Sequence, residues 1–271
     1  MPEPASPAMP EIKDICLVTA VDVEFNVATS LLNSKIFSTE FQIKTCRGTA
    51  GDDSGQKRIT VMQCGMGAPA FAERLSEHLR HYTYDMLLIA GLAGGLDPAL
   101  KSGDAVIYDI CHDGRNHPNA TTKEKSPGRD ENASIHCHDQ VQAIIFNALQ
   151  TAGRRCVRGS GVVVDRIITE SQQKLSLGAR YQAIAADMES YDALGVCHDL
   201  GLPAAALRII SDDAGSDLPD FNWAAEADGR MNPWRTAAAM FARPVASLKF
   251  LLGIRSVLGA LRKNLKIVIH T

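Results

Sequence analysis

The sequence predicts an α/β fold, a three-layer α/β/α sandwich with a mostly parallel, mixed central sheet. Short apolar runs typical of buried strands recur along the chain, as in Asp14 to Ala20, Asp85 to Ala90 and Ala204 to Ile210. Glycines follow several of these runs, and stretches with helical periodicity lie between them. Apolar strands that alternate with helices imply a sheet covered on both faces.

The expected elements alternate along the chain. The first strand precedes a helix over residues 24–32, and the strand at 58–64 ends in Gly65-Met66-Gly67 before a helix over 70–81. The strand at 85–90 is expected to stop at the glycines of segment 91–95. Further strands are expected at 104–110, 161–164, 185–187 and 204–210, with a helix over 190–200. The polar segment 112–134 predicts a long surface loop.

Composition and cysteine pattern indicate a globular protein of a reducing compartment. The 271 residues are 45% hydrophobic and 22% charged, which disfavours a disordered or collagen-like chain. The seven cysteines are scattered and never spaced C-x-x-C, which disfavours a disulfide framework and a zinc ribbon. We therefore expect a cytoplasmic protein with a disordered tail over 1–13, a catalytic domain over 14–215 and a basic helical extension over 216–271. We expect no metal.

Three acids follow predicted strands. Glu24 comes just after the first strand, Glu189 follows Asp187-Met188, and Asp212 follows Ser211 at the end of the last core strand. Each acid taken alone could be a helix-terminal or turn residue. Ligand sites in such sheets lie at the carboxyl ends of the strands, so three acids there together predict an active site.

The motifs around these acids resemble the nucleoside phosphorylase and nucleosidase superfamily, which includes methylthioadenosine/S-adenosylhomocysteine nucleosidase. The resemblance is carried by Glu24 after the opening strand and by CGMGAP, GLAGGLDPALKSGD, DMES and RIISDDA. It implies that Met188 and Glu189 contact the ribose, that Ile167 lies against the base and that Asp212 protonates N7 of the purine. Glu24 would activate the attacking water.

The same resemblance gives the remaining expected substrate contacts: Leu92, Ala93, Gly94, Ser211 and Arg208. For its role, Asp212 would have to hold a proton, which calls for burial or for a neighbouring carboxylate such as Asp213. Breaking an N-ribosidic bond places positive charge on the sugar and negative charge on the base. An acid at the base and an acceptor at the ribose hydroxyls would both stabilise that transition state.

The chain departs from the phosphorylases of this superfamily. Where they carry an Arg and commonly a Ser, this sequence has Ile89 and Leu92, which weakens the case for a phosphate site. Gly65, Gly67 and Arg47 remain candidate anion contacts, and water is the favoured nucleophile. We expect no cofactor, with inorganic phosphate as the alternative co-substrate. Leu92 also predicts a more apolar pocket beside the ribose.

The C-terminal stretch from Leu218 resembles the tail of hopanoid-associated phosphorylases, which implies adenosylhopane as the substrate and release of adenine. The product would be ribosylhopane or its phosphorylated form. A methylthioadenosine/S-adenosylhomocysteine nucleosidase and a general purine nucleoside phosphorylase are the alternatives within the superfamily. A catalytically inactive nucleoside-binding protein is the alternative of another class, and the retention of all three acids disfavours it.

Charge is distributed unevenly along the chain. Residues 229–271 contain eight Lys or Arg and no Asp or Glu, so this part carries +8 and the rest −11, within a total of −3. Leucines recur at helical spacing from Val245 onward. Such a helix could lie on an anionic membrane surface, or dock on the protein's own core or on another subunit. We expect no nucleic-acid partner, and the family implies a homo-oligomer.

Overall fold

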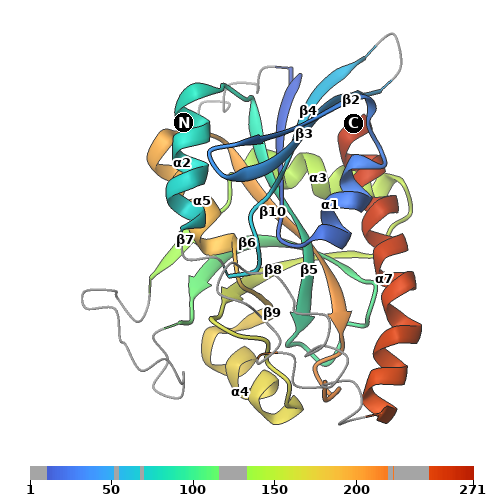
Figure 1. The fold of residues 1–271 in the computed structure, drawn as a ribbon. Helices are drawn as coiled ribbons and strands as arrows, with labels where there is room; N and C mark the ends of the chain where they lie inside the picture. The colour runs from blue at the N-terminus through green and yellow to red at the C-terminus, as the bar shows by residue number, and fades with distance from the viewer. Residues whose placement is uncertain (1–10, 52–54, 68–69, 116–132, 219–221, 223–243) are drawn as a thin grey trace, which may run out of the picture.

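The computed structural model describes residues 11–51, 55–67, 70–115, 133–218, 222 and 244–271. Over these residues a mixed ten-stranded sheet lies between helices on both of its faces (Figure 1). The predicted α/β sandwich is thereby confirmed. Residues 1–10 of the expected tail, 116–132 of the expected loop, and 219–221 and 223–243 of the expected extension lie outside the described part.

The elements alternate largely as the sequence predicts. The strands are β1 (Asp14–Thr19), β2 (Asn33–Glu40), β3 (Ile43–Ala50), β4 (Lys57–Gln63), β5 (Met86–Gly95), β6 (Ala105–Asp113), β7 (Ser134–His136), β8 (Cys156–Val163), β9 (Ala183–Asp187) and β10 (Ala204–Asp212). The helices are α1 (Asp22–Thr29), α2 (Phe71–His81), α3 (Asp139–Thr151), α4 (Ser171–Tyr181), α5 (Ser190–Leu200) and α7 (Pro244–His270). Helices α2 and α5 pack together on one face, and α1, α3 and α7 pack together on the other (Figure 1).

Four parallel strands, in the order β4, β1, β5 and β10, form the centre of the sheet. Their side chains are apolar on both faces, and Leu17, Leu88 and Leu207 are at most 2% exposed. Helices must cover such strands on both sides to bury these side chains. Because β1, β5 and β10 are parallel, the residues at their carboxyl ends lie at one edge of the sheet.

Part of the sheet closes into a ring. Strand β10 pairs with both β5 and β6, and the path through β8 and β9 leads back to β5. Tyr108 of β6, a strand of this ring, is fully buried. A Cβ on Gly161 of β8 would lie 2.1 Å from the Tyr108 ring, so only glycine fits there.

The predicted end of the third core strand is wrong. Instead of stopping at the glycines of segment 91–95, β5 continues through them to Gly95. A Cβ on Gly91 would lie 2.6 Å from Glu24 Oε1, and a Cβ on Gly95 would lie 2.9 Å from the main-chain oxygen of Asp212. These glycines therefore permit close approach of neighbouring groups to a continuous strand rather than forming a turn.

Five elements are absent from the sequence-based prediction: β2, β3, β7, α3 and α4. Strand β2 lies at the edge of the sheet and is largely exposed, so it lacks the apolar run that marks a buried strand. Strand β7, at residues 134–136, pairs with the end of β6 where the long polar loop was expected to finish. Helix α4 presents mostly polar residues and buries only Lys174 and Leu177.

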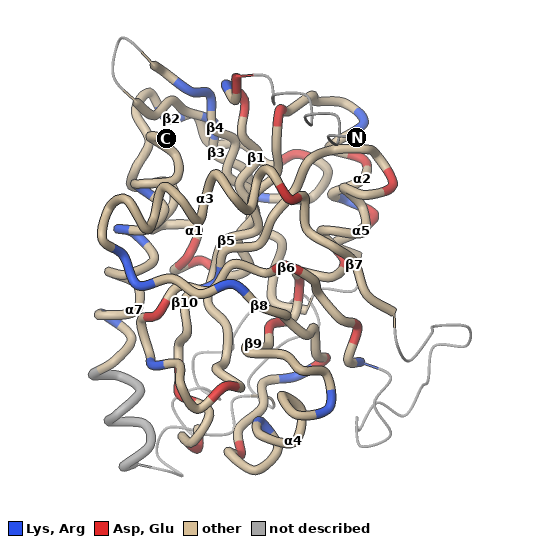
Figure 2. The backbone as a smooth tube through the Cα atoms, turned by 180° about the vertical axis from the view of Figure 1, so that it is seen from behind, with Lys and Arg blue, Asp and Glu red and all other residues tan. Residues whose placement is uncertain are grey.

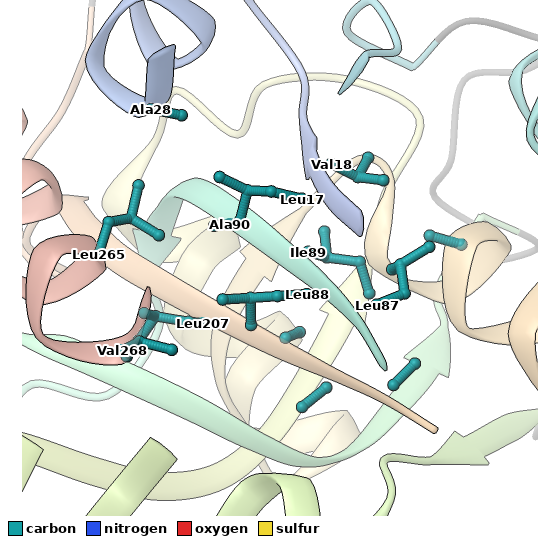
Figure 3. Close-up of a cluster of buried hydrophobic side chains, with 14 of the residues drawn as sticks. Leu17, Val18, Ala28, Leu87, Leu88, Ile89, Ala90, Leu207, Leu265 and Val268 are labelled. Carbon is teal, nitrogen blue, oxygen red and sulfur yellow. The ribbon is translucent and has the colours of Figure 1, made fainter. Parts of the chain in front are cut away.

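Helix α7 packs on the body of the protein and contacts α1, α3, β5 and β10. Leu261, Leu265 and Val268 are at most 5% exposed, and Figure 3 shows Leu265 and Val268 beside Leu207 of β10. Arg262 on the outer side of the helix bonds Ser30 after α1, with 3.3 Å between Nε and Oγ. Among the helices in the described ranges, none is both long and apolar enough to span a membrane.

Leu265→Ala should lower the free energy of unfolding by about 2 to 5 kcal/mol, because it removes a fully buried side chain and leaves a cavity between α7 and the sheet. Urea unfolding followed by circular dichroism measures this change. The exposed neighbour Lys266 provides the control, since Lys266→Ala should change stability by less than about 0.5 kcal/mol. Equal transition midpoints for the two variants would show that α7 is not part of the core.

Candidate active site

A cavity of about 220 Å³ lies at the carboxyl ends of β1, β5, β9 and β10. It is lined by Glu24 of α1, Leu92 of β5, Glu189 before α5 and Asp212 of β10. A neighbouring hollow of about 470 Å³ shares its wall at Ile168 but is lined by the polar surface of α4 and none of these acids. The smaller cavity is therefore the candidate active site.

Arg208 of β10 lies at the centre of the buried charges and is 1% exposed. Its Nη2 donates to Asp187 Oδ1 at 2.9 Å, to Ser190 Oγ at 2.8 Å and to Glu189 Oε2 at 3.4 Å. Burial alone would lower the pKa of Arg208, but the carboxylates of Asp187 and Glu189 raise it above its usual range. The guanidinium is therefore a permanent positive charge beneath the cavity.

Glu24 is 3% exposed and held by main-chain donors. Its Oε2 accepts from the nitrogen of Ala20 at 2.8 Å and of Val21 at 3.2 Å, and its Oε1 accepts from the nitrogen of Leu92 at 2.7 Å. Burial raises the pKa of Glu24, although Arg208 and these hydrogen bonds oppose the rise. A carboxyl group so placed takes up a proton more readily than an exposed glutamate does.

Glu189 lies on the other side of Arg208 and is 5% exposed. Its Oε1 accepts from the nitrogen of Gly67 at 3.1 Å. Burial raises the pKa of Glu189 to about 8; Arg208 opposes this shift, while Asp187 and Glu24 add to it. Three carboxyl groups thus surround one guanidinium, and repulsion between them favours protonation of part of the cluster.

Asp212 belongs to a separate charged pair. One of its oxygens, Oδ2, accepts a short hydrogen bond from Nζ of Lys174 in α4, and Oδ1 accepts from Ser211 Oγ at 2.5 Å. Asp213, expected as the neighbouring carboxylate, instead accepts from the nitrogen of Ser102 at 2.7 Å and pairs with Lys101 at 3.4 Å. The group beside Asp212 is therefore a cation, and the expected role of Asp213 is wrong.

The remaining expected substrate contacts line the same cavity: Leu92, Ala93, Gly94, Ile167, Met188 and Ser211. The main chain of Ile167 is bonded by the side-chain amide of Asn222, with its nitrogen 2.8 Å from Asn222 Oδ1 and its oxygen 2.9 Å from Nδ2. Ser211 Oγ also lies 3.1 Å from the main-chain oxygen of Ala93. Met188 lies against the turn at Gly67, where a Cβ would come within 2.8 Å of its Cε.

The three candidate anion contacts do not come together. The nitrogen of Gly65 donates to Ala20 at 2.9 Å, and that of Gly67 donates to Glu189. Arg47 of β3 pairs with Glu40 at 2.6 Å and lines a different hollow, beside Tyr82. The main-chain nitrogens of Gly65 and Gly67 therefore donate to acceptors within the protein.

Two buried residues of this site are not among the sequence-based candidates. Asp187 positions Arg208 and accepts from the nitrogens of Glu189 and Ser190 at 2.9 and 2.8 Å. Lys174 pairs with Asp212 from a distant segment of the chain. Asp187 lies inside the motif that contains Glu189, which could have indicated it. Lys174 belongs to no motif, and only its helical spacing to Leu177 places it on the buried face of α4.

Comparison with known families decides the classification, since the model of the phosphorylase superfamily matches residues 14–246. The chain belongs to the phosphorylase superfamily. Membership confirms the predicted superfamily and, with it, the expectation of an enzyme.

Relatives within the phosphorylase superfamily include nucleosidases. A 5′-methylthioadenosine/S-adenosylhomocysteine nucleosidase of Actinobacillus succinogenes is 27% identical over 214 residues, which cover 76% of this chain and 90% of that protein. The nucleosidase of the same name from Neisseria meningitidis, solved with methylthio-immucillin-A, superposes with a TM-score of 0.71 at 18% identity, over 95% of this chain and 99% of that one. Futalosine hydrolase of Helicobacter pylori gives a TM-score of 0.65 at 18% identity, over 92% and 98% of the two chains.

Glu189→Gln should flatten the pH dependence of stability. Because the folded protein holds the Glu189 proton up to about pH 8, whereas an ordinary Glu releases it near 4.5, the folded state binds the extra proton between these values. The wild type should therefore lose stability relative to the variant as pH rises through this window, by roughly 1 kcal/mol per pH unit. Urea unfolding at pH 5, 6.5, 8 and 9 tests this, with the exposed Glu77→Gln as control. Parallel curves for Glu189→Gln and wild type would contradict the raised pKa.

Proposed function

We propose that the protein hydrolyses the N-ribosidic bond of an adenine nucleoside and releases adenine, with adenosylhopane as the substrate. The observation that carries this proposal is the convergence of Glu24, Glu189 and Asp212 on one cavity. The names of the nucleosidase relatives support the same type of reaction. An inactive nucleoside-binding protein would not need a base, a ribose acceptor and an acid in one cavity.

The charges suit the steps of this reaction. Asp212 donates a proton to N7 of adenine as the bond between N9 and C1′ breaks and its electron pair moves to the base. Water then bonds to C1′ and transfers a proton to Glu24, whose raised pKa fits this role. Glu189 accepts hydrogen bonds from the ribose hydroxyls. The positive charge that develops on the sugar faces the acid cluster around Arg208.

Water is the proposed nucleophile rather than phosphate. Phosphorolysis requires several donors directed at one anion, and Gly65, Gly67 and Arg47 have other partners and lie apart. Arg208 is committed to Asp187, Glu189 and Ser190. These contacts favour hydrolysis.

The apolar wall of the cavity supports a nucleoside with a large apolar 5′ group. Met66, Leu92, Leu96, Ile168, Met188 and Leu218 all line it. Each Å² of apolar ligand surface that such a wall removes from water contributes about 25 cal/mol to the free energy of binding. Methylthioadenosine and S-adenosylhomocysteine are the alternative substrates, and the 27% identical relative favours them.

Adenine release from adenosylhopane, methylthioadenosine and adenosine, each with and without phosphate, tests the proposal. We expect adenosylhopane to be cleaved fastest and phosphate to have no effect. Asp212→Asn should lower the rate by at least about 10²-fold, because it removes the general acid. Asp213→Asn changes the neighbouring carboxyl, which points away to Ser102, and is the matched control.

Each of the other outcomes of this assay has a clear meaning. Faster turnover of methylthioadenosine would assign the alternative substrate, and dependence on phosphate would identify a phosphorylase. Full activity of Asp212→Asn would remove this residue from the mechanism. No adenine from any nucleoside would leave only the binding protein.

The outer face of α7 supports contact with an anionic membrane surface, from which a lipid-linked nucleoside would be drawn. Arg255, Arg262, Lys263 and Lys266 are exposed on it, and Lys and Arg recur along this helix in Figure 2. The proposed enzyme is a cytoplasmic homo-oligomer that lies at the inner face of the membrane. The opposite face of α7 is buried in the core, so binding would involve the docked helix.

Replacing these four basic residues with Gln should reduce co-sedimentation with vesicles that contain phosphatidylserine, since each charge near such a surface contributes about 1 kcal/mol. The variant keeps the buried leucines, so its folding should be preserved, as circular dichroism would verify. Vesicles of phosphatidylcholine alone are the control and should bind neither protein. Equal sedimentation of variant and wild type with the anionic vesicles would exclude this surface as the contact.

A further inference from the structure

The pair of Lys174 and Asp212 has features that the proposed roles of the acids leave unexplained. Lys174 is 1% exposed although it is a lysine, a residue type that is almost never fully buried unless paired. Its Nζ donates to Asp212 Oδ2, to the main-chain oxygen of Ser216 at 2.7 Å and to that of Asp213 at 3.3 Å. All three ammonium hydrogens thus have acceptors.

A purely structural role is a weak explanation for this lysine. The turn after β10 is already fixed to the start of α4 by two other bonds. The nitrogen of Leu218 donates to the oxygen of Thr169 at 2.8 Å, and the nitrogen of Ser171 donates to Asp217 Oδ1 at 2.9 Å. Burying an ammonium is costly, and an uncharged side chain could have filled this position. The charge itself therefore calls for a reason, and within the described part of the chain the ion-pair partner of Lys174 is Asp212.

We propose that Lys174 is a positioning residue for the acid that protonates the departing base. Its ammonium orients the Asp212 carboxyl group and balances the charge that this group acquires when its proton moves to the base. This inference rests on the proposed function, since it requires a leaving base that accepts a proton.

The geometry fixes the carboxyl group from both sides. Lys174 holds Oδ2, and Ser211 Oγ holds Oδ1. Two donors on different oxygens prevent rotation of the group about its terminal bond. A general acid must lie within hydrogen-bond reach of the atom that it protonates, so fixing its plane contributes directly to the rate.

The charge balance follows the movement of one proton. Asp212 transfers its proton to N7 of the purine and is left as a carboxylate beside the Lys174 ammonium. The bond from C1′ to N9 breaks, and its electrons go to the base. Lys174 keeps its three hydrogens throughout, so the negative charge left on Asp212 by the transfer faces an ammonium. Its attraction for Asp212 is therefore stronger late in the step than at its start, which is the condition for lowering the barrier.

This pair is separate from the cluster around Arg208. Glu24 and Glu189 share Arg208, whereas Asp212 has Lys174 from a different helix. Arg208 therefore lies beside the acids on the side of the attacking water and the ribose, and Lys174 lies beside the acid on the side of the leaving base. A change at Lys174 should impair departure of the base and leave binding of the ribose largely intact.

The first measurement is the kinetics of adenine release from methylthioadenosine by Lys174→Met. We expect kcat to fall about tenfold or more, as part of the 10² to 10⁴-fold contribution of a general acid, and KM to change by less than about threefold. Lys101→Met is the matched control, because Lys101 is an exposed lysine that pairs with the adjacent Asp213. Lys174→Gln keeps a donor for the turn but lacks the charge, and should show the same loss. If one of these two Lys174 variants fails to fold, the kcat and KM of the other variant test the proposal.

The second measurement compares binding of adenine and 7-deazaadenine, which lacks the N7 acceptor. Wild type should prefer adenine by about tenfold or more, the typical value of a hydrogen bond to an ionisable group. Lys174→Met should lose most of that preference while Lys101→Met keeps it. A general loss of packing would weaken both ligands alike and leave their ratio unchanged.

The outcomes separate this inference from the function on which it rests. A wild type that cleaves no nucleoside and binds no adenine overturns both. An active wild type whose Lys174 variants match Lys101→Met in kcat, or keep the preference for adenine, overturns the role of Lys174 alone. A lower kcat together with a lost preference for N7 supports it.

Discussion

The buried guanidinium of Arg208 is the interaction on which the site depends. It lies among Asp187, Glu189 and Ser190, and its field extends to Glu24 across the gap at Gly91. Without this cation, buried carboxyl groups at the ends of β1 and β9 would face one another with little solvent around them, at a cost of several kcal/mol. With it, Glu24 and Glu189 can lie in one pocket, each with a pKa above that of an exposed glutamate.

The sequence predicts which residues lie at the carboxyl edge of the sheet better than it predicts where each strand ends. Parallel apolar strands must end at one edge, so Glu24, Glu189 and Asp212 could be brought together by their positions after strands alone. Contacts between distant segments could not be foreseen in this way. Lys174 lies in a polar stretch without a motif, and nothing local distinguishes it from an exposed lysine. Gly91 resembles a turn residue in the sequence, whereas the contact that requires it involves Glu24, 67 residues earlier.

The charges of the site are divided between two supports of different kinds. Arg208 extends from a core strand and is fixed by its neighbours in the sheet, while Lys174 reaches in from α4 at the rim. The acid beside the base is thus paired with a cation from a helix outside the sheet, and the ribose side with a cation from a strand within it.

The ring formed by β5, β10, β6, β8 and β9 also has a consequence for folding. One of its pairs joins β5 to β10, more than 100 residues apart in the chain. Pairings over such separations form slowly, because the entropy of closing a long loop is lost before the stabilising contacts form. Glu24 comes from the first part of the chain and Asp212 from the last. During synthesis the pocket therefore lacks part of its lining until the chain has been made beyond Leu218.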